Sequence, residues 1–193
     1  AVQEALLEGL RTKRNRVELD YRMIKPDGTI LWVRSKGSAR AGDHGATVGY
    51  GTTSDITGHK RAEAALRLAE DRLHQILDSL DGLVYVADMK TYETLFVNRY
   101  GQEIWGDLTG KTCWQNLQSG QEGPCSFCTN DRLLRPDGAP AGVHVWEFQN
   151  TVTGQWYECR DSAIPWPDGR TVRLEIAMDI TERKLAENAL RES

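Results

Sequence analysis

The stretch TVRLEIAMDI, which begins at Thr171, alternates apolar and polar side chains. Its apolar positions are Val172, Leu174, Ile176 and Met178, and its polar positions are Arg173, Glu175 and Asp179. Because a β-strand turns successive side chains to opposite faces, this period of two predicts a half-buried strand over about 171–180. Stretches rich in β-branched and aromatic residues predict four further strands near 82–88, 94–98, 142–151 and 155–164.

Turn sequences separate β-rich stretches in both halves of the chain. Pro26-Asp27-Gly28 lies between two β-rich stretches, where proline presets φ and glycine accepts the positive φ that closes a hairpin. Trp166-Pro167-Asp168-Gly169 repeats this arrangement before the last strand. Residues 99–134, between the second and third strands of the later half, have helix-like pieces and no strand pattern. Two strands, short helices and then three strands predict an α+β fold with a five-stranded antiparallel sheet.

A helical period follows each of two Asp-Ile-Thr triplets, at Asp55–Thr57 and Asp179–Thr181. Thr57 and Thr181 are plausible N-caps of these helices. The first helix carries an apolar seam with spacings of four and three residues, formed by Ala62, Leu66, Ala69, Leu73, Ile76 and Leu80. Such a seam favours a homodimer through the connecting helices. A helix packed only on its own domain is the alternative.

The two triplets belong to a longer repeat. The positions of Asp55 and Asp179 differ by 124 (179 − 55), and the same shift superposes Trp32 on Trp156. Solenoid repeats are only about 20–50 residues long, so a shift of this size indicates tandem copies of a domain. The first copy is short, and we expect it to be incomplete. The predicted organisation is a C-terminal part of a first domain (1–60), a connecting helix (61–80), a complete second domain (81–180) and the start of an output helix (181–193).

The composition and charge of the chain limit the kinds of molecule that it is expected to bind. The 193 residues are 39% hydrophobic and 27% charged, with a formal net charge of −4. This balance is that of an ordinary globular protein and argues against binding to nucleic acid or to an anionic membrane surface. The sequence has no signal peptide and no apolar run long enough to span a bilayer. We therefore expect a cytoplasmic piece of a longer protein, without membrane contact by this fragment.

The order of elements, the two Asp-Ile-Thr triplets with their charged helices, the Pro-Asp-Gly hairpin turns and Phe96-Val97-Asn98 after the second strand resemble PAS domains. The resemblance covers about 80–184 as a full domain and 17–60 as the last strands of another. It implies helices on one face of the sheet, a small-molecule pocket between them and connecting signalling helices. It further implies a non-catalytic sensor in a bacterial signalling protein, ahead of a downstream effector such as a histidine kinase or diguanylate cyclase.

The same resemblance directs attention to two sets of residues. A ligand pocket would lie between the sheet and the helical segment, and its candidate lining residues are Tyr85, Phe96, Ile104, Trp105, Trp114, Phe127, Trp146, Trp156 and Tyr157. Filling of an ordinary core by these aromatic side chains is the alternative. A conformational change would leave the domains at the two triplets, through Asp55, Thr57, Asp179 and Thr181.

All four cysteines, Cys113, Cys125, Cys128 and Cys159, lie in the later half of the chain, and two of them form a CxxC pair. Thiolates at this spacing can hold a soft metal, so a metal or iron–sulfur site is one hypothesis. A reversible thiol redox pair and plain packing are the others. Thr129 follows the CxxC, where a c-type haem requires histidine. The last strand lacks the glutamine that the resemblance would require for a photoactive flavin. The ligand itself stays open.

Overall fold

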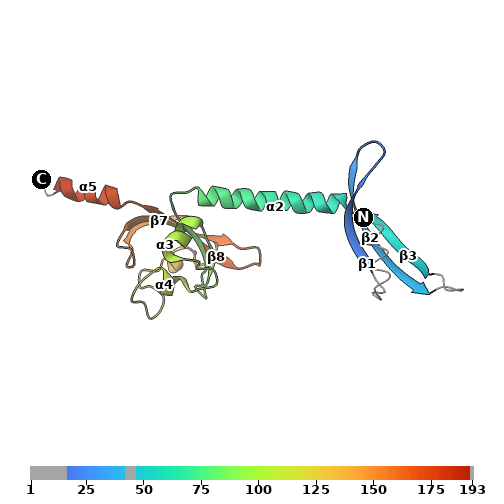
Figure 1. Cartoon of the computed structure of the whole chain (residues 1–193). Coiled ribbons are helices and arrows are strands. Elements are labelled where there is room, and N and C mark those ends of the chain that lie inside the picture. The colour runs from blue at the N-terminus through green and yellow to red at the C-terminus, as the bar shows by residue number, and fades with distance from the viewer. Residues whose placement is uncertain (1–16, 42–46, 192–193) are drawn as a thin grey trace. The chain divides into compact units, whose positions relative to one another are not determined.

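The computed structural model describes residues 17–41 and 47–191. The chain divides into two compact units between Asp71 and Arg72, and each unit is described separately (Figure 1). The rest of the predicted first-domain fragment, residues 1–16 and 42–46, lies outside the described residues. The four-part domain organisation stays a prediction.

The first unit contains an antiparallel sheet in the order β1-β2-β3, formed by β1 (Val17–Ile24), β2 (Ile30–Ala41) and β3 (Thr47–Asp55). The predicted turn joins β1 to β2, where the Gly28 amide donates to the Lys25 carbonyl at 2.9 Å. Gly28 has φ of 83°, a left-handed conformation that favours glycine. Helix α2 (Thr57–Asp78) follows β3 and continues past the boundary between the units.

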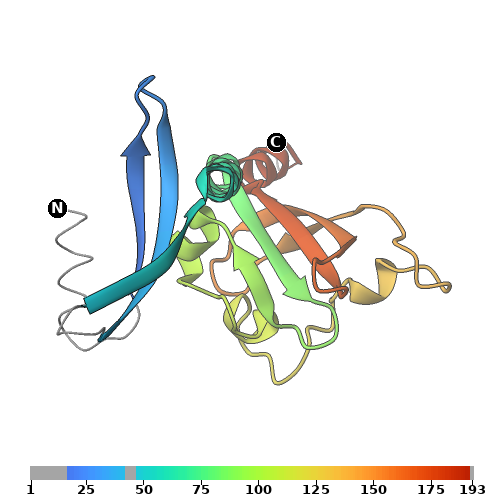
Figure 2. The same cartoon turned by 90° about the vertical axis from the view of Figure 1, so that its right-hand side faces the viewer.

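The second unit contains the predicted five strands. They are β4 (Gly82–Asp88), β5 (Thr94–Val97), β6 (His144–Gln149), β7 (Trp156–Pro165) and β8 (Thr171–Asp179). Every neighbouring pair is antiparallel, in the order β5-β4-β8-β7-β6 (Figure 2). The segment between β5 and β6 carries α3 (Arg99–Trp105), α4 (Cys113–Asn116) and the 3-10 helix η2 (Asn130–Arg132). This arrangement confirms the predicted α+β fold. Helix α5 (Thr181–Arg191) follows β8.

One buried side chain holds the start of the helical segment against the sheet. Asn98 caps α3, and its side-chain oxygen accepts from the amides of Val84 and Gly101 at 3.0 and 3.2 Å. Its side-chain nitrogen donates to the carbonyls of Leu77 and Gly82 at 3.1 and 2.9 Å. Because four backbone groups depend on this amide, Asn98 links the end of α2, strand β4 and helix α3.

Helix α2 exposes most of its length within the described chain. Leu66, Leu73 and Ile76, three members of the predicted seam, are 63%, 57% and 61% exposed. Among the described residues, no helix is long and apolar enough to cross a membrane.

Candidate functional site

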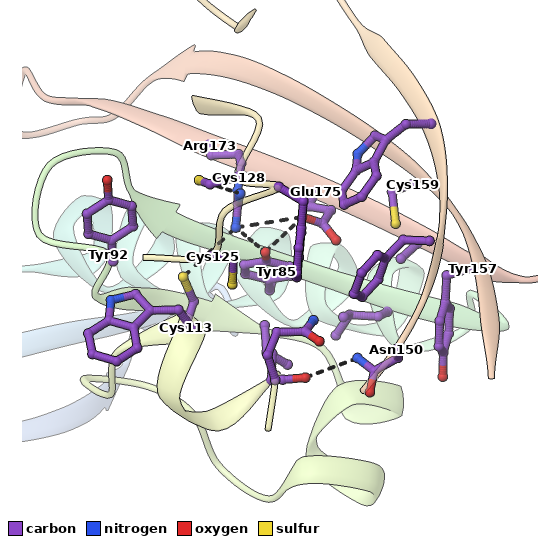
Figure 3. A pocket seen from close by; sticks show the side chains of 18 of the residues that line it. Tyr85, Tyr92, Cys113, Cys125, Cys128, Asn150, Tyr157, Cys159, Arg173 and Glu175 are labelled. Atoms are coloured by element: carbon purple, nitrogen blue, oxygen red, sulfur yellow. Dashed lines mark hydrogen bonds and ion pairs between the residues drawn. The ribbon is translucent and has the colours of Figure 1, made fainter. Parts of the chain in front are cut away.

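A pocket in the second unit lies between the sheet and the helical segment, and Figure 3 shows it at close range. Strands β4, β6, β7 and β8 line it on one side, and α3, α4 and the loop with the CxxC pair line it on the other. Its open volume is about 50 Å³, compared with about 10–15 Å³ for one water molecule in the same measure. The pocket therefore has room for a few water molecules or a very small ligand, and a flavin or haem would require rearrangement.

The face that the first half of β8 turns toward this pocket is polar. Arg173, Glu175 and Ala177 line the pocket, whereas Met178, on the other face, is 37% exposed. The strand and its period were predicted correctly, and both faces of its first half are buried, with the polar one lining the pocket and Val172 on the other face. The sequence reasoning assigned no site role to Arg173 or Glu175.

Arg173 is the centre of the polar contacts in the pocket (Figure 3). Its guanidinium donates to the Tyr85 hydroxyl and lies 3.7 Å from the nearer Glu175 carboxylate oxygen. It also points N–H groups at the sulfurs of Cys128 and Cys113, at 3.7 and 3.9 Å. Burial favours loss of its proton, but Tyr85 and Glu175 more than offset this, so the pKa of Arg173 stays well above its ordinary value. The pocket therefore contains a buried positive charge.

Two carboxyl groups lie next to each other on neighbouring strands. Asp161 of β7 pairs in register with Glu175 of β8, and both side chains are buried. Glu175 accepts from the Tyr85 hydroxyl at 2.8 Å. Burial, and then the charge of Asp161, raise the pKa of Glu175 to about 7, although Arg173 opposes this shift. With Glu175 protonated, the charges of Arg173 and Asp161 balance.

Asp161 of β7 is fully buried, and its hydrogen bonds connect β7 to β6 and to the segment between β5 and β6. The Trp146 indole N–H donates to its Oδ2 at 2.9 Å, and the Thr129 hydroxyl donates to the same oxygen. Its other oxygen has no hydrogen-bond partner among the described residues. Because Glu175 pairs in register with Asp161, a protonated Glu175 could donate to this neighbouring carboxyl group.

All four cysteines line the pocket. Cys159 lies on the face of β7 that looks toward the helical segment. Cys113 and Cys159 are 6% and 3% exposed, and burial raises the pKa of both thiols, to about 11 for Cys113. However, no three His, Cys, Asp or Glu residues of the described chain are grouped so that they could hold a metal ion. The metal or iron–sulfur site at these cysteines stays a prediction, which elemental analysis of anaerobically prepared protein tests.

The predicted aromatic lining divides into two groups. The structure brings six of the predicted residues together around the pocket: Tyr85, Trp105, Trp114, Phe127, Trp146 and Tyr157. It does not bring Phe96, Trp156 or Ile104 there. Phe96 packs edge-on against His74 of α2, with ring centroids 5.8 Å apart, and Lys184 of α5 lies over Trp156. Ile104 is 39% exposed. These three residues are therefore unsuited to contact a ligand in this pocket.

At the end of β8, the triplet Asp179-Ile180-Thr181 forms a connected junction with β7. The Thr181 hydroxyl accepts from the Trp156 amide at 3.0 Å, and Asp179 accepts from the Thr181 amide at 2.8 Å. Lys184 lies 5.2 Å from the centre of the Trp156 ring and forms an ion pair with Glu147 of β6. We call these contacts between the triplet, the tryptophan and the lysine the exit junction.

The first unit repeats the exit junction residue by residue. The Thr57 hydroxyl accepts from the Trp32 amide at 2.9 Å, and Asp55 accepts from the Thr57 amide at 2.8 Å. Lys60 lies 5.9 Å from the centre of the Trp32 ring and 3.8 Å from a carboxylate oxygen of Asp20. The repeated triplet therefore joins the last strand to the following helix in the same way in both units.

The second unit combines a five-stranded antiparallel sheet, short helices against one of its faces and a pocket between the two. The last strand leads directly into a helix. This is a PAS-like domain. No family model matches the chain. A protein of Sinorhizobium fredii, described as the uncharacterized protein y4lL, is 25% identical over 105 residues, which are 54% of this chain. The chain spans only 12% of that relative's length.

Several solved structures are similar to the chain. The PAS domain of an HTR-like protein from Haloarcula marismortui has a TM-score of 0.46 and 18% identity, over 63% of this chain and 99% of that one. The PAS domain of Bordetella pertussis BvgS has a TM-score of 0.40 and 20% identity, over 68% and 99%. An RNA-binding light-oxygen-voltage receptor has a TM-score of 0.45 and 13% identity, over 99% and 84%. The strand order and the pocket, rather than these scores, identify the PAS-like fold.

Proposed function

We propose that the second unit is the sensory module of a bacterial signalling protein, in which a change in the pocket passes through the exit junction to a downstream effector. One observation carries this proposal. Strand β8 contributes Arg173 and Glu175 to the pocket and Asp179 to the exit junction. A shift of this strand would therefore alter both places. The effector, a histidine kinase or a diguanylate cyclase, would be another domain of the parent protein in the cytoplasm.

The chemistry of the pocket favours sensing over catalysis. Its polar groups are largely engaged with one another, through Arg173, Tyr85 and the carboxyl pair of Asp161 and Glu175. A small ligand, a proton or an oxidant that breaks one contact would redistribute the others, because the buried charges have few alternative partners. Native mass spectrometry of the protein purified from its own source would identify a retained ligand.

A double-mutant cycle tests the connection between the pocket and the exit junction. Glu175→Gln changes the pocket and Thr181→Val removes the hydroxyl that accepts from Trp156. The two sites are roughly 20 Å apart along an extended chain, so independent effects on the free energy of unfolding would add to within about 0.5 kcal/mol. We expect a coupling energy above this limit at pH 8.

The control cycle pairs Thr181→Val with Asp168→Asn, which changes an exposed carboxylate that contacts Arg170 in the turn at the other end of β8. This cycle should be additive. Additivity in both cycles would contradict the proposed coupling. The fold and the presence of the pocket do not depend on this result.

We further propose that the protein forms a homodimer through α2. The helix carries Leu66, Leu73 and Ile76 at seam positions and exposes all three, so a second copy would bury an apolar stripe. Replacing both Leu66 and Leu73 by glutamate should give a monomer in analytical ultracentrifugation. Leu68→Glu is the matched control, because Leu68 is 50% exposed on the same helix but lies outside the seam. An unchanged dimer in the double variant would mean that the interface lies elsewhere.

A further inference from the structure

The CxxC pair is folded into a tight turn. The Cys128 amide donates to the Cys125 carbonyl at 2.9 Å, a hydrogen bond between residues i and i+3. A turn of this kind holds its first and last Cα atoms within about 7 Å, and disulfides span about 4.4–6.8 Å between Cα atoms. The backbone at Cys125 and Cys128 is therefore close to the geometry that a disulfide requires, without a large change of fold.

The two thiols of this turn are also the accessible ones. Cys125 and Cys128 are half-buried at the pocket, whereas Cys113 and Cys159 are buried (Figure 3). The pocket's open volume of about 50 Å³ admits a molecule only slightly larger than water. An oxidant of that size can reach Cys125 and Cys128, while a large disulfide-containing molecule would be confined to the rim.

A buried cation stands beside one of the two sulfurs. The Arg173 guanidinium points an N–H group at the Cys128 sulfur from 3.7 Å, and the same side chain contacts Tyr85 and Glu175. A cation in this position stabilises the negative charge that a sulfur carries when it attacks an oxidant. Cys125 has no such contact among the hydrogen bonds of the described residues. This asymmetry distinguishes an attacking sulfur, Cys128, from a second sulfur that completes the bond.

We propose that Cys125 and Cys128 are a reversible modification site, at which hydrogen peroxide or another small hydroperoxide forms a disulfide. The Cys128 sulfur attacks one peroxide oxygen, the O–O bond breaks, and the other oxygen leaves as water, or as an alcohol from an organic hydroperoxide, which gives a sulfenic acid. The Cys125 sulfur then attacks the Cys128 sulfur, the S–S bond forms, and the second oxygen leaves as water. Together the two thiols give two protons and two electrons to the peroxide.

Disulfide formation would change the contacts of strand β8. Bonding to Cys125 would move the Cys128 sulfur, so Arg173 would lose this contact while keeping those to Tyr85 and Glu175. The inference thereby adds an input to the proposed sensory function. The disulfide forms whether or not the exit junction transmits the change, so the two claims fail separately.

Peptide mapping tests the site directly. The reduced full chain is exposed to excess hydrogen peroxide, unfolded in denaturant, treated with iodoacetamide and digested. We expect an internal disulfide in the peptide that holds Cys125 and Cys128, together with alkylated Cys113 and Cys159. Four alkylated cysteines would overturn the proposal, and so would a disulfide that involves Cys113 or Cys159. Subsequent treatment with dithiothreitol should restore four alkylatable thiols.

The rate of peroxide consumption tests the part assigned to Arg173 as a positioning residue. Arg173→Gln should slow disulfide formation about tenfold, and Arg173→Lys, which keeps the charge, should restore most of the rate. Arg170→Gln is the matched control. Arg170 immediately precedes β8 and contacts Asp88 and Asp168, and none of its described contacts is to a sulfur. A wild-type rate in folded Arg173→Gln would refute this part. If that variant does not fold, the mapping of the wild-type chain still decides the proposal.

Discussion

Replacing Glu175 by glutamine should stabilise the protein, and more so as the pH rises. Glutamine resembles the protonated form of Glu175, since its amide oxygen can accept from the Tyr85 hydroxyl and its amide nitrogen can donate to Asp161. Unlike Glu175, it cannot add a second negative charge beside Asp161. The variant therefore keeps the contacts of the pocket and removes only the cost of ionising Glu175.

The magnitude follows from the pKa of Glu175. Its folded-state pKa is about 7, against an ordinary value of 4.5, so the folded chain holds this proton over a pH range in which the unfolded chain has lost it. Stability from this group is fully present below about pH 4.5, falls as the pH rises, and is lost above about pH 7. At about 1.4 kcal/mol for each pKa unit, the loss comes to roughly 3 kcal/mol.

Urea unfolding followed by tryptophan fluorescence at pH 5, 6, 7 and 8 measures this effect. The difference between the variant and the wild type isolates Glu175 from other groups that titrate. We expect a difference below about 1 kcal/mol at pH 5 and roughly 2–3 kcal/mol in favour of Glu175→Gln at pH 8. Asp168→Asn is the control: hydrogen bonds from Arg170 hold the pKa of Asp168 below its ordinary 3.8, so its effect should be the same at pH 5 and pH 8. A difference for Glu175→Gln that is the same at pH 5 and pH 8 would refute the reasoning.

Further predictions concern packing and caps, and the same unfolding assay checks them. Asn98→Ala removes hydrogen bonds to four backbone groups and should destabilise the second unit by about 3 kcal/mol. Gly101→Ala would place a Cβ 2.5 Å from two apolar side chains and should cost about 1–3 kcal/mol. Gly58→Ala in α2 meets nothing within 4 Å and should be neutral or stabilising by up to about 1 kcal/mol. Thr181→Val removes the acceptor of the Trp156 amide and should cost about 1 kcal/mol.

The strands were predictable because two local signals agree. Period-two alternation marks β8, and a turn that needs a glycine with positive φ, such as Gly169 at φ of 86°, marks where it begins. Each predicted strand of the second unit accordingly matches an observed one to within about two residues at either end. The repeated exit junction was predictable for a related reason, because its contacts are between residues that the repeat itself preserves.

The polar interior of the pocket could not be predicted from alternation. A period of two separates the side chains of β8 into two faces but does not say which one is inside. The usual assumption buries the apolar face. Val172 of that face is buried, but Arg173 and Glu175 of the polar face are buried as well, because they meet Tyr85 of β4, Asp161 of β7 and each other. Tyr85 lies 90 residues before Glu175, so no local pattern reveals this partner.

The alternation of side chains along β7 could have corrected the list of predicted pocket residues. Trp156 and Tyr157 are neighbours on one strand, so both cannot face the same pocket. The structure points Tyr157 inward and leaves Trp156 under Lys184 at the exit junction.

Hydrogen–deuterium exchange followed by mass spectrometry tests the central claim most directly, because it reports separately on the pocket and on the helix beyond it. Wild type and Glu175→Gln are compared at pH 8, with Asp168→Asn, in the turn at the other end of β8, as the control. If the pocket communicates with the exit junction, the amides of residues 179–191 will change their exchange rates in Glu175→Gln and not in the control. Changes confined to residues 171–176, with 179–191 identical to wild type, would contradict it.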